Sequence, residues 1–218
     1  MSVCYVVGAG EWSGPSFVPG AGDLVLAADG GLTHLRRRGI RVDAFVGDGD
    51  SLMGEVPAGC ERIALPRQKN DTDMLAALRL GCERGYRRFA LYGGCGGRLD
   101  HTLANLQCLA WLARRGAQGL LYGDRVVLTA IRNGTFCPPA APGATVSVFA
   151  WGGPARGVTL SGLQYPLRQA VLTPDFPLGV SNVQGAEKSS ITVEDGVLLI
   201  CYEGSSSIWG ENSSQLSR

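Results

Sequence analysis

The spacing of apolar residues changes near residue 124, and this change limits the chain to few architectures. In the first half, short apolar runs typical of strands alternate with segments whose apolar residues recur every three or four positions, as in helices. Such alternation predicts a mostly parallel sheet with helices on its faces. The expected strands are residues 3–8, 24–28, 44–47, 62–65, 89–92 and 120–123, and the expected helices are 32–38, 74–84 and 101–114.

After residue 125 the helical spacing stops, and Gly and Pro clusters separate strand-like runs. The expected strands are residues 126–131, 144–150, 157–160, 190–193 and 197–201. We therefore predict two domains, an α/β domain at 1–124 and an all-β sandwich at 125–218. The Ser-rich end of the chain is expected to fray from about residue 204.

Charge and cysteine usage exclude several classes of protein. The chain carries 20 Lys and Arg against 19 Asp and Glu, a net charge of +1. This balance gives no overall attraction for nucleic acid or an anionic membrane, and no segment approaches the roughly 18 apolar residues of a membrane span. Seven cysteines without a Cys-x-x-Cys pair favour reduced thiols over a disulfide framework or a zinc site. We expect a cytoplasmic protein that meets anions only at a local site.

Acidic residues follow several of the predicted strands. Asp29, Asp48, Asp50 and Asp73 stand in such segments, and Asp100 follows the fifth strand. Taken singly, each could be a turn or helix-cap residue. Because the carboxyl ends of parallel strands meet at one edge of the sheet, we expect these carboxylates to converge there. Converging carboxylates repel one another unless a cation neutralises them, and Mg²⁺ prefers oxygen ligands, so the pattern predicts a magnesium site.

A glycine-rich loop at residues 93–97 precedes Arg98. The loop is neither a Walker A sequence nor a G-x-G-x-x-G fingerprint. Its backbone amides could still approach an anion closely, with help from the following helix N-terminus and the planar guanidinium of Arg98. We therefore expect this loop to bind a polyphosphate.

The third predicted helix offers two different faces. His101 and Asn105 lie one turn apart and could both face the anion site. The alternative for His101 is packing at the helix cap. The residues that suit the buried face are Leu99, Leu103, Leu106 and Ala110. His34, in the first helix, is expected to be a surface residue.

Taken together, four ordered segments of the first half resemble the thiamine pyrophosphokinase family. They read Ala28-Asp29-Gly30-Gly31, Gly47-Asp48-Gly49-Asp50-Ser51, Asn70-Asp71-Thr72-Asp73 and Gly96-Gly97-Arg98-Leu99-Asp100-His101. The second half also resembles this family, in Gly162-Leu163-Gln164-Tyr165-Pro166-Leu167 and in the later pair Ser181-Asn182. The resemblance spans nearly the whole chain.

The resemblance implies a nucleotide-binding α/β domain followed by a β-sandwich, in a homodimer whose active sites lie between subunits. The implied reaction transfers the pyrophosphoryl group of ATP to the hydroxyl of thiamine, with Mg²⁺, and gives AMP and thiamine diphosphate. Four kinds of site residue follow by matching positions. They are Asp48, Asp50, Asp73 and Asp100 for the metal; Asp73, Arg98 and Asp100 for catalysis; Asp29, Gly30, Gly94, Gly97, Arg98, His101 and Asn105 for the nucleotide; and Asp50, Tyr165, Ser181 and Asn182 for thiamine, the last three from the partner chain.

Two departures and two alternatives stay open. Gly49 replaces a bulkier residue that is common in the family. Many members have a carboxylate where this chain has Asn70, and some have one where it has Gln68. The number of metal ions and their ligands are therefore open. Asp73 or Asp100 is the expected acceptor of the hydroxyl proton. One alternative is a pyrophosphokinase for another heterocyclic alcohol, such as a pterin. The other is a non-catalytic sensor of thiamine or a nucleotide.

Overall fold

The computed structural model describes residues 2–49, 56–64 and 70–204 and has a mixed α/β fold with a large sheet and few helices. The expected tail beyond residue 204 lies outside the described residues. Among the residues described, no helix has the length and apolar character needed to cross a membrane. The large sheet with its few helices confirms the general α/β fold class predicted from the sequence.

The first half forms six strands in the order β4-β3-β2-β1-β5-β6, all paired in parallel. The strands are β1 (Cys4–Val7), β2 (Leu24–Ala28), β3 (Ala44–Gly47), β4 (Glu61–Ala64), β5 (Arg88–Tyr92) and β6 (Gln118–Tyr122). The helices are α1 (Gly31–Arg37), α2 (Asp73–Glu83) and α3 (Leu99–Ala113). Each lies within one or two residues of its expected position.

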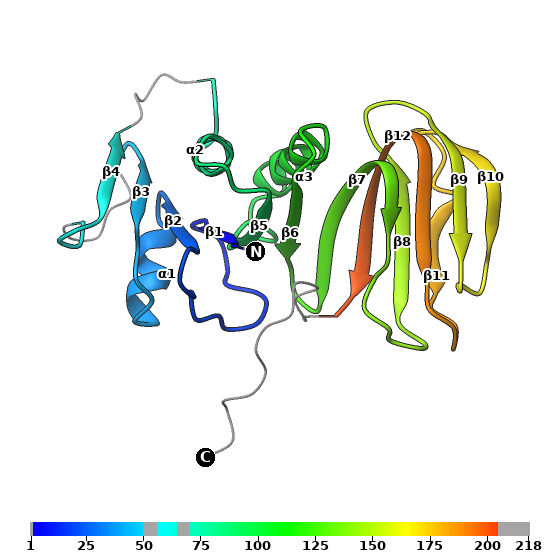
Figure 1. The fold of residues 1–218 in the computed structure, drawn as a ribbon, viewed down its shortest axis with the longest axis horizontal. Helices are drawn as coiled ribbons and strands as arrows, with labels where there is room; N and C mark the ends of the chain where they lie inside the picture. Colours follow the sequence, from blue (N-terminus) through cyan, green and yellow to red (C-terminus); the bar gives the residue numbers. More distant parts are fainter. Residues whose placement is uncertain (1, 50–55, 65–69, 205–218) are drawn as a thin grey trace, which may run out of the picture.

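The helices cover both faces of this part of the sheet (Figure 1). Successive residues of a strand point to opposite faces. Val6 and Leu26 therefore join the apolar cluster that includes α2 and α3, whereas Val7 and Ala27 join the cluster that includes α1. Both layers are buried, which explains why these strands read as continuous apolar runs.

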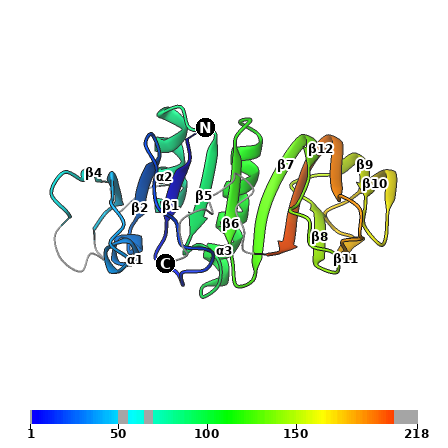
Figure 2. The same ribbon diagram turned by 60° about the horizontal axis from the view of Figure 1, so that its bottom comes forward.

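The second half continues the same sheet through the antiparallel pairing of β6 with β7 (Figure 2). Its strands are β7 (Val126–Phe136), β8 (Thr145–Ala150), β9 (Ala155–Ser161), β10 (Leu167–Leu172), β11 (Gly179–Val183) and β12 (Ser190–Glu203). The sheet divides at β12, whose first part pairs with β9 and whose last part pairs with β8. The two branches enclose a core that includes Phe136, Ile191 and Ile200.

The structure of this half differs from expectation in three respects. Strand β7 continues to Phe136, beyond its expected end at residue 131. Residues 190–193 and 197–201 form one strand, β12, with a register shift between Val193 and Val197 that interrupts the apolar pattern. Strands β10 and β11 were not expected, because most of their side chains are exposed or half-buried and give no clear alternation.

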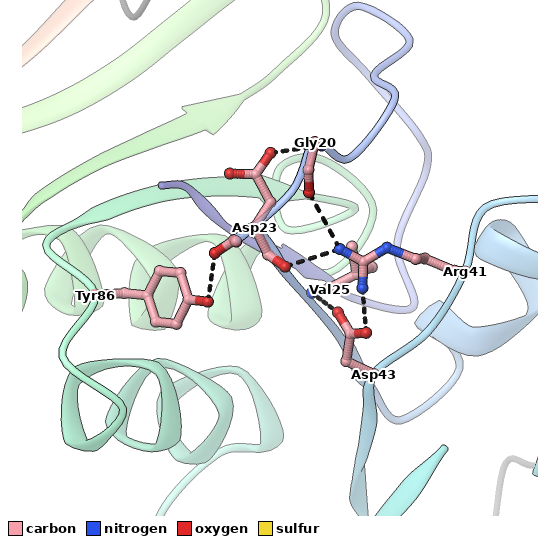
Figure 3. A network of polar contacts seen from close by, with 7 residues as sticks. Gly20, Asp23, Val25, Arg41, Asp43 and Tyr86 are labelled. Carbon is pink, nitrogen blue, oxygen red and sulfur yellow. Dashed lines mark hydrogen bonds and ion pairs between the residues drawn. The ribbon is translucent and has the colours of Figure 1, made fainter. Parts of the chain in front are cut away.

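Side chains tie together the amino-terminal edge of the parallel strands (Figure 3). Asp23 accepts a hydrogen bond from the Val3 amide at 2.8 Å, and Asp43 accepts one from the Val25 amide at 2.7 Å. Arg41 contacts both Asp43 and the Asp23 carbonyl. A cavity of about 430 Å³ lies at this edge, beside Tyr86. Ligands bind at the carboxyl ends of parallel strands, so this edge is not the candidate site.

Candidate functional site

A cleft of about 410 Å³ lies at the carboxyl ends of the central strands. From β1 the strands run β2-β3-β4 on one side and β5-β6 on the other. Loops diverge where the strand order reverses in this way, and open α/β sheets bind their ligands in the resulting crevice. The cleft brings together many of the predicted site residues, namely Asp29, Asp73, Gly94, Gly97, Arg98, His101 and Asn105.

The floor of the cleft is made of backbone, held by glycines of two loops. The Gly8 amide donates to the Tyr92 carbonyl at 2.8 Å, and the Gly10 amide donates to the Gly93 carbonyl at 2.9 Å. Gly93 has a φ of +60°, and a Cβ atom there would lie 2.4 Å from the Gly8 carbonyl oxygen. Only glycine allows the two loops to approach this closely.

The rim of the cleft is open at the end of the glycine-rich loop. Gly96 and Gly97 have φ values of +86° and +65°, and added Cβ atoms would meet nothing within 4 Å. The loop leads into α3, where Arg98 is the N-cap residue. The positive end of the α3 dipole and the Arg98 side chain therefore lie beside open space that an anion could enter.

Arg98 and Asp100 form an exposed ion pair. The Arg98 Nη2 atom lies 2.6 Å from Asp100 Oδ2, and Nε lies 3.2 Å from Oδ1. The guanidinium, together with the His101 amide, lowers the pKa of Asp100, and the carboxylate raises the pKa of Arg98. Exposed ion pairs contribute little to stability. Arg98 can therefore exchange Asp100 for an anionic ligand at small cost.

Asp73 is the first residue of α2 and lines the cleft. The helix begins there because Thr72 caps it, its Oγ1 accepting a hydrogen bond from the Leu75 amide at 3.2 Å. The neighbouring Asp71 does not line the cleft and instead lies 3.2 Å from Arg79 Nε. Two aspartates two positions apart thus have different surroundings.

Asp29 follows β2 and has a φ of +48°, a left-handed conformation that few residues other than glycine, asparagine and aspartate adopt. Its amide donates to the Val46 carbonyl at 2.9 Å. The Oδ1 atom is buried, and no group in the described part of the chain donates a hydrogen bond to it. Gly30, the N-cap of α1, is not among the cleft-lining residues and packs beneath the first loop, where a Cβ would lie 2.9 Å from that of Ala9.

The predicted acidic cluster is described only in part. Asp48 follows β3 and does not line the cleft, and Asp50 lies outside the described residues. Within residues 2–49, 56–64 and 70–204, no three His, Cys, Asp or Glu side chains gather as metal ligands would. Asp48, Asp50, Asp73 and Asp100 as magnesium ligands stay a prediction.

The two helix residues predicted to face the site differ in role. His101 lines the cleft at an exposed position. Asn105 is buried, and its Nδ2 atom donates to the Gly94 carbonyl at 2.7 Å, so it holds the glycine-rich loop in place. The expected buried face of α3 was partly wrong, because Leu99 is 71% exposed and Leu103 also faces outward.

The first loop was missed as part of the site. Gly8, Ala9 and Gly10 line the cleft directly after β1. The rule that located the other loops, namely to examine the residues that follow each strand, would have found them. His34 is also not simply a surface residue, because its Nε2 atom lies 2.7 Å from the Gly10 carbonyl oxygen.

The second half carries a separate polar arrangement around Tyr165. The buried Asn182 side chain, 4% exposed, accepts from the Tyr165 amide at 2.9 Å and donates to the Tyr165 carbonyl at 2.7 Å. The same Oδ1 atom accepts from the Val183 amide. Tyr165 itself is 61% exposed. Ser181, at a φ of +58°, is exposed. None of these residues lines the cleft, which is built from residues 8–105.

Comparison with protein families gives two matches. The model of the thiamin pyrophosphokinase catalytic domain matches residues 20–120, and that of the thiamin pyrophosphokinase vitamin B1 binding domain matches residues 135–198. A search of curated proteins finds no match.

Solved structures with the same fold include two thiamine pyrophosphokinases and one thiamin pyrophosphokinase family protein. The crystal structure of thiamine pyrophosphokinase from Bacillus subtilis has a TM-score of 0.79 at 22% identity, covering 94% of this chain and 99% of that one. The thiamin pyrophosphokinase family protein from Enterococcus faecalis has a TM-score of 0.79 at 24% identity, covering 94% and 100%. The thiamin pyrophosphokinase from Geobacillus thermodenitrificans has a TM-score of 0.74 at 26% identity, covering 99% and 100%.

Proposed function

Because the chain belongs to the thiamin pyrophosphokinase family, we propose that the glycine-lined cleft is where it binds ATP and transfers a pyrophosphoryl group. The enzyme is a thiamine diphosphokinase, which converts ATP and thiamine to AMP and thiamine diphosphate. The observation that carries the assignment of the site is the convergence of the glycine backbone, Asp73 and Arg98 on one cleft at the reversal of strand order.

The reaction needs charge to be stabilised on both sides of the β-phosphorus, because AMP leaves as the thiamine hydroxyl attacks. The amides of the glycine-rich loop and the N-terminus of α3 would bind phosphate oxygens. Arg98 would turn from Asp100 to the transferred group, which its planar fork fits. Asp73, fixed at the start of α2, would accept or orient the hydroxyl proton, with Asp100 as the other candidate. Positioning of the two substrates supplies much of the remaining acceleration.

We propose that the cleft binds Mg²⁺, which takes carboxylate oxygens and phosphate oxygens together. Asp73 lines the cleft, and Asp48 follows the neighbouring strand β3. We propose Asp48, Asp50, Asp73 and Asp100 as the residues that would hold it. When bound with ATP, the ion would neutralise charge that develops on the phosphates.

A direct assay tests the proposed function. Purified protein is expected to release AMP from ATP only when both thiamine and Mg²⁺ are present, in amounts equal to the thiamine diphosphate formed. Release of ADP, or AMP release that does not depend on thiamine, would reject this assignment.

We propose that thiamine binds through Tyr165, contributed by a second copy of the chain, with Ser181 and Asn182 near it. The cationic ring of thiamine can stack on an exposed aromatic side chain. A homodimer would also cover several exposed apolar residues. They are Leu99, Leu103, Val171, Phe176, Leu178 and Val180.

The proposed domains are 1–124, an α/β ATP-binding domain, and 125–218, a β-sandwich for thiamine binding and dimerisation. The proposed compartment is the cytoplasm, where its seven free thiols would stay reduced.

Tyr165 and Asn182 are expected to affect thiamine binding alone. Tyr165→Ala removes the stacking surface and should raise the KM for thiamine about 10-fold, with the KM for ATP nearly unchanged. Asn182→Ala removes the two hydrogen bonds that fix the Tyr165 backbone and should raise the same KM while speeding hydrogen exchange of the Tyr165 amide. Initial rates with each substrate varied in turn measure both effects. An equal loss for both substrates would contradict stacking.

Mixing two impaired variants at low thiamine tests whether the sites lie between subunits. If Asp73 and Tyr165 of one site come from different chains, a heterodimer of Asp73→Asn and Tyr165→Ala chains has one intact site and one doubly altered site. Random reassociation of equal amounts should then restore about a quarter of wild-type activity at low thiamine. If each site lies within one chain, the mixture should show only the sum of the two separate activities.

A further inference from the structure

We propose that His34 is a positioning residue for nucleotide binding, which fixes the first loop of the cleft in the shape that ATP meets. The inference rests on the proposed function of the cleft and goes beyond it, because His34 belongs to α1 and does not itself line the cleft. It starts from one contact, in which the His34 Nε2 atom lies 2.7 Å from the Gly10 carbonyl oxygen.

The chemistry of this contact sets the direction of the hydrogen bond. A carbonyl oxygen can only accept, so Nε2 carries a proton and donates it to Gly10. Nε2 is protonated in the charged imidazolium and in one of the two neutral tautomers, and the contact selects that tautomer. His34 therefore holds Gly10 to α1 whether its ring is neutral or charged.

Gly10 is held from two sides. Its carbonyl accepts from His34, and its amide donates to the Gly93 carbonyl, in the loop after β5, at 2.9 Å. A Cβ atom at Gly10 would lie 2.7 Å from that same Gly93 oxygen, so a larger residue does not fit. The loop must keep a glycine here, and glycine restricts its own backbone least of all residues. The restriction therefore has to come from a neighbouring element, which is α1.

The hydrogen bond also fixes the orientation of a peptide group at the edge of the cleft. In a trans peptide the carbonyl and the following amide point in opposite directions, so the Glu11 amide points away from His34. Without this donor, rotation at Gly10 could turn the peptide over and exchange the places of an amide and a carbonyl. Phosphate oxygens accept hydrogen bonds from amides and are repelled by carbonyl oxygens. A loop held in one orientation is preorganised for the nucleotide.

A second contact holds the same loop to α1. The Trp12 ring stacks on Tyr92 of β5 with the ring centroids 4.7 Å apart, and the Arg38 guanidinium lies 4.0 Å from the Trp12 centroid. Arg38 follows His34 by four positions, which places both side chains on one side of α1. Because Trp12 anchors the loop beyond Gly10, removal of the His34 ring should loosen the lining of the cleft while the rest of the loop stays packed.

Three substitutions of His34 test this role. His34→Ala removes the donor and should weaken binding of a non-hydrolysable ATP analogue, measured with Mg²⁺ and without thiamine, about 3- to 10-fold, as loss of one hydrogen bond predicts. The side-chain nitrogen of glutamine lies as many bonds from Cβ as Nε2 does, so His34→Gln should restore the affinity to within about twofold of wild type. The nitrogen of asparagine lies closer to Cβ, so His34→Asn should resemble His34→Ala.

Two further measurements separate positioning from a general loss of stability. In His34→Ala the KM for ATP should rise about 3- to 10-fold, whereas the KM for thiamine should change by less than about twofold. Hydrogen exchange of the Gly10 amide should accelerate more than that of the Ile200 amide, which reports on the core strand β12. Arg37→Ala, which changes an exposed residue of the same helix, is the control and should keep the wild-type values.

The outcomes distinguish this inference from the proposed function. If thiamine-dependent AMP release fails but the analogue binds, and His34→Ala weakens that binding, the reaction is misassigned and the role of His34 stands. The inference is overturned if the wild-type protein does not bind the analogue, or if His34→Ala keeps the wild-type affinity. It is also overturned if the KM values for both substrates rise equally, or if His34→Gln binds no better than His34→Ala.

Discussion

Replacing Asp73 by asparagine is expected to lower kcat about 100- to 1000-fold, the range seen when one group that stabilises a transition state is removed. Asp73 lines the cleft at the first position of α2, where its carboxylate can serve both the proposed ion and the hydroxyl proton. The amide has the same size but cannot accept that proton. Loss of one acidic group at the helix start costs only about 0.3–1 kcal/mol, so the variant should fold.

The matched control is Asp71→Asn, two residues earlier. Asp71 pairs with Arg79 on the outside of α2, and this half-exposed pair contributes little, so kcat should stay within about twofold of wild type. Asp100→Asn, measured in parallel, tests the other candidate for proton transfer. If Asp73→Asn and Asp100→Asn both retain near wild-type turnover, the acidic residues have been given the wrong role. Thermal unfolding of each variant shows whether a lost rate reflects chemistry or misfolding.

The second large effect is expected on stability, from Gly31→Ala. Alanine favours a helix over glycine by about 1 kcal/mol, which alone would stabilise α1. The contact outweighs this gain, because the new Cβ would lie 1.8 Å from the Val7 carbonyl oxygen and 2.5 Å from its carbon, both backbone atoms. Overpacking against backbone that cannot move should lower the free energy of unfolding by about 3 kcal/mol and Tm by about 10 °C.

Urea unfolding followed by far-UV circular dichroism measures this loss, with Gly153→Ala as the control. A Cβ at Gly153 meets nothing within 4 Å, so its free energy of unfolding should change by less than about 0.5 kcal/mol. Equal stabilities of the two variants would show that α1 can shift away from β1.

The sequence was most informative about the residues that follow strands. Parallel strands place their carboxyl ends together, so a list of strand ends already brought Asp29, Asp73 and Arg98 near one another. The first loop, with Gly8 and Gly10, was missed although it obeys the same rule. No sequence pattern shows that a Cβ at Gly93 would collide with the Gly8 carbonyl, because that contact joins residues far apart in the chain.

Other features depend on tertiary packing that a periodic pattern does not specify. The apolar residues of α3 form two rows along the helix. The sheet packs against the row that contains Cys108, Leu109 and Leu112, so Leu99 remains exposed. Asn182 matched a substrate-binding position by resemblance. Its side chain turns inward and forms hydrogen bonds with the Tyr165 backbone, a contact that only the folded register of β11 reveals.

The antiparallel pairing of β6 with β7 has a practical consequence for anyone who divides this protein. A fragment that ends at residue 124 would lose the pairing of Leu121 and Tyr122 with Leu128 and Val127, and the outer side of β6 would become a free sheet edge. Exposed edges of this kind recruit other chains and promote aggregation. It would also uncover Tyr122, which is buried together with Val127. The catalytic half is thus expected to need the second half to protect the edge of its sheet from aggregation.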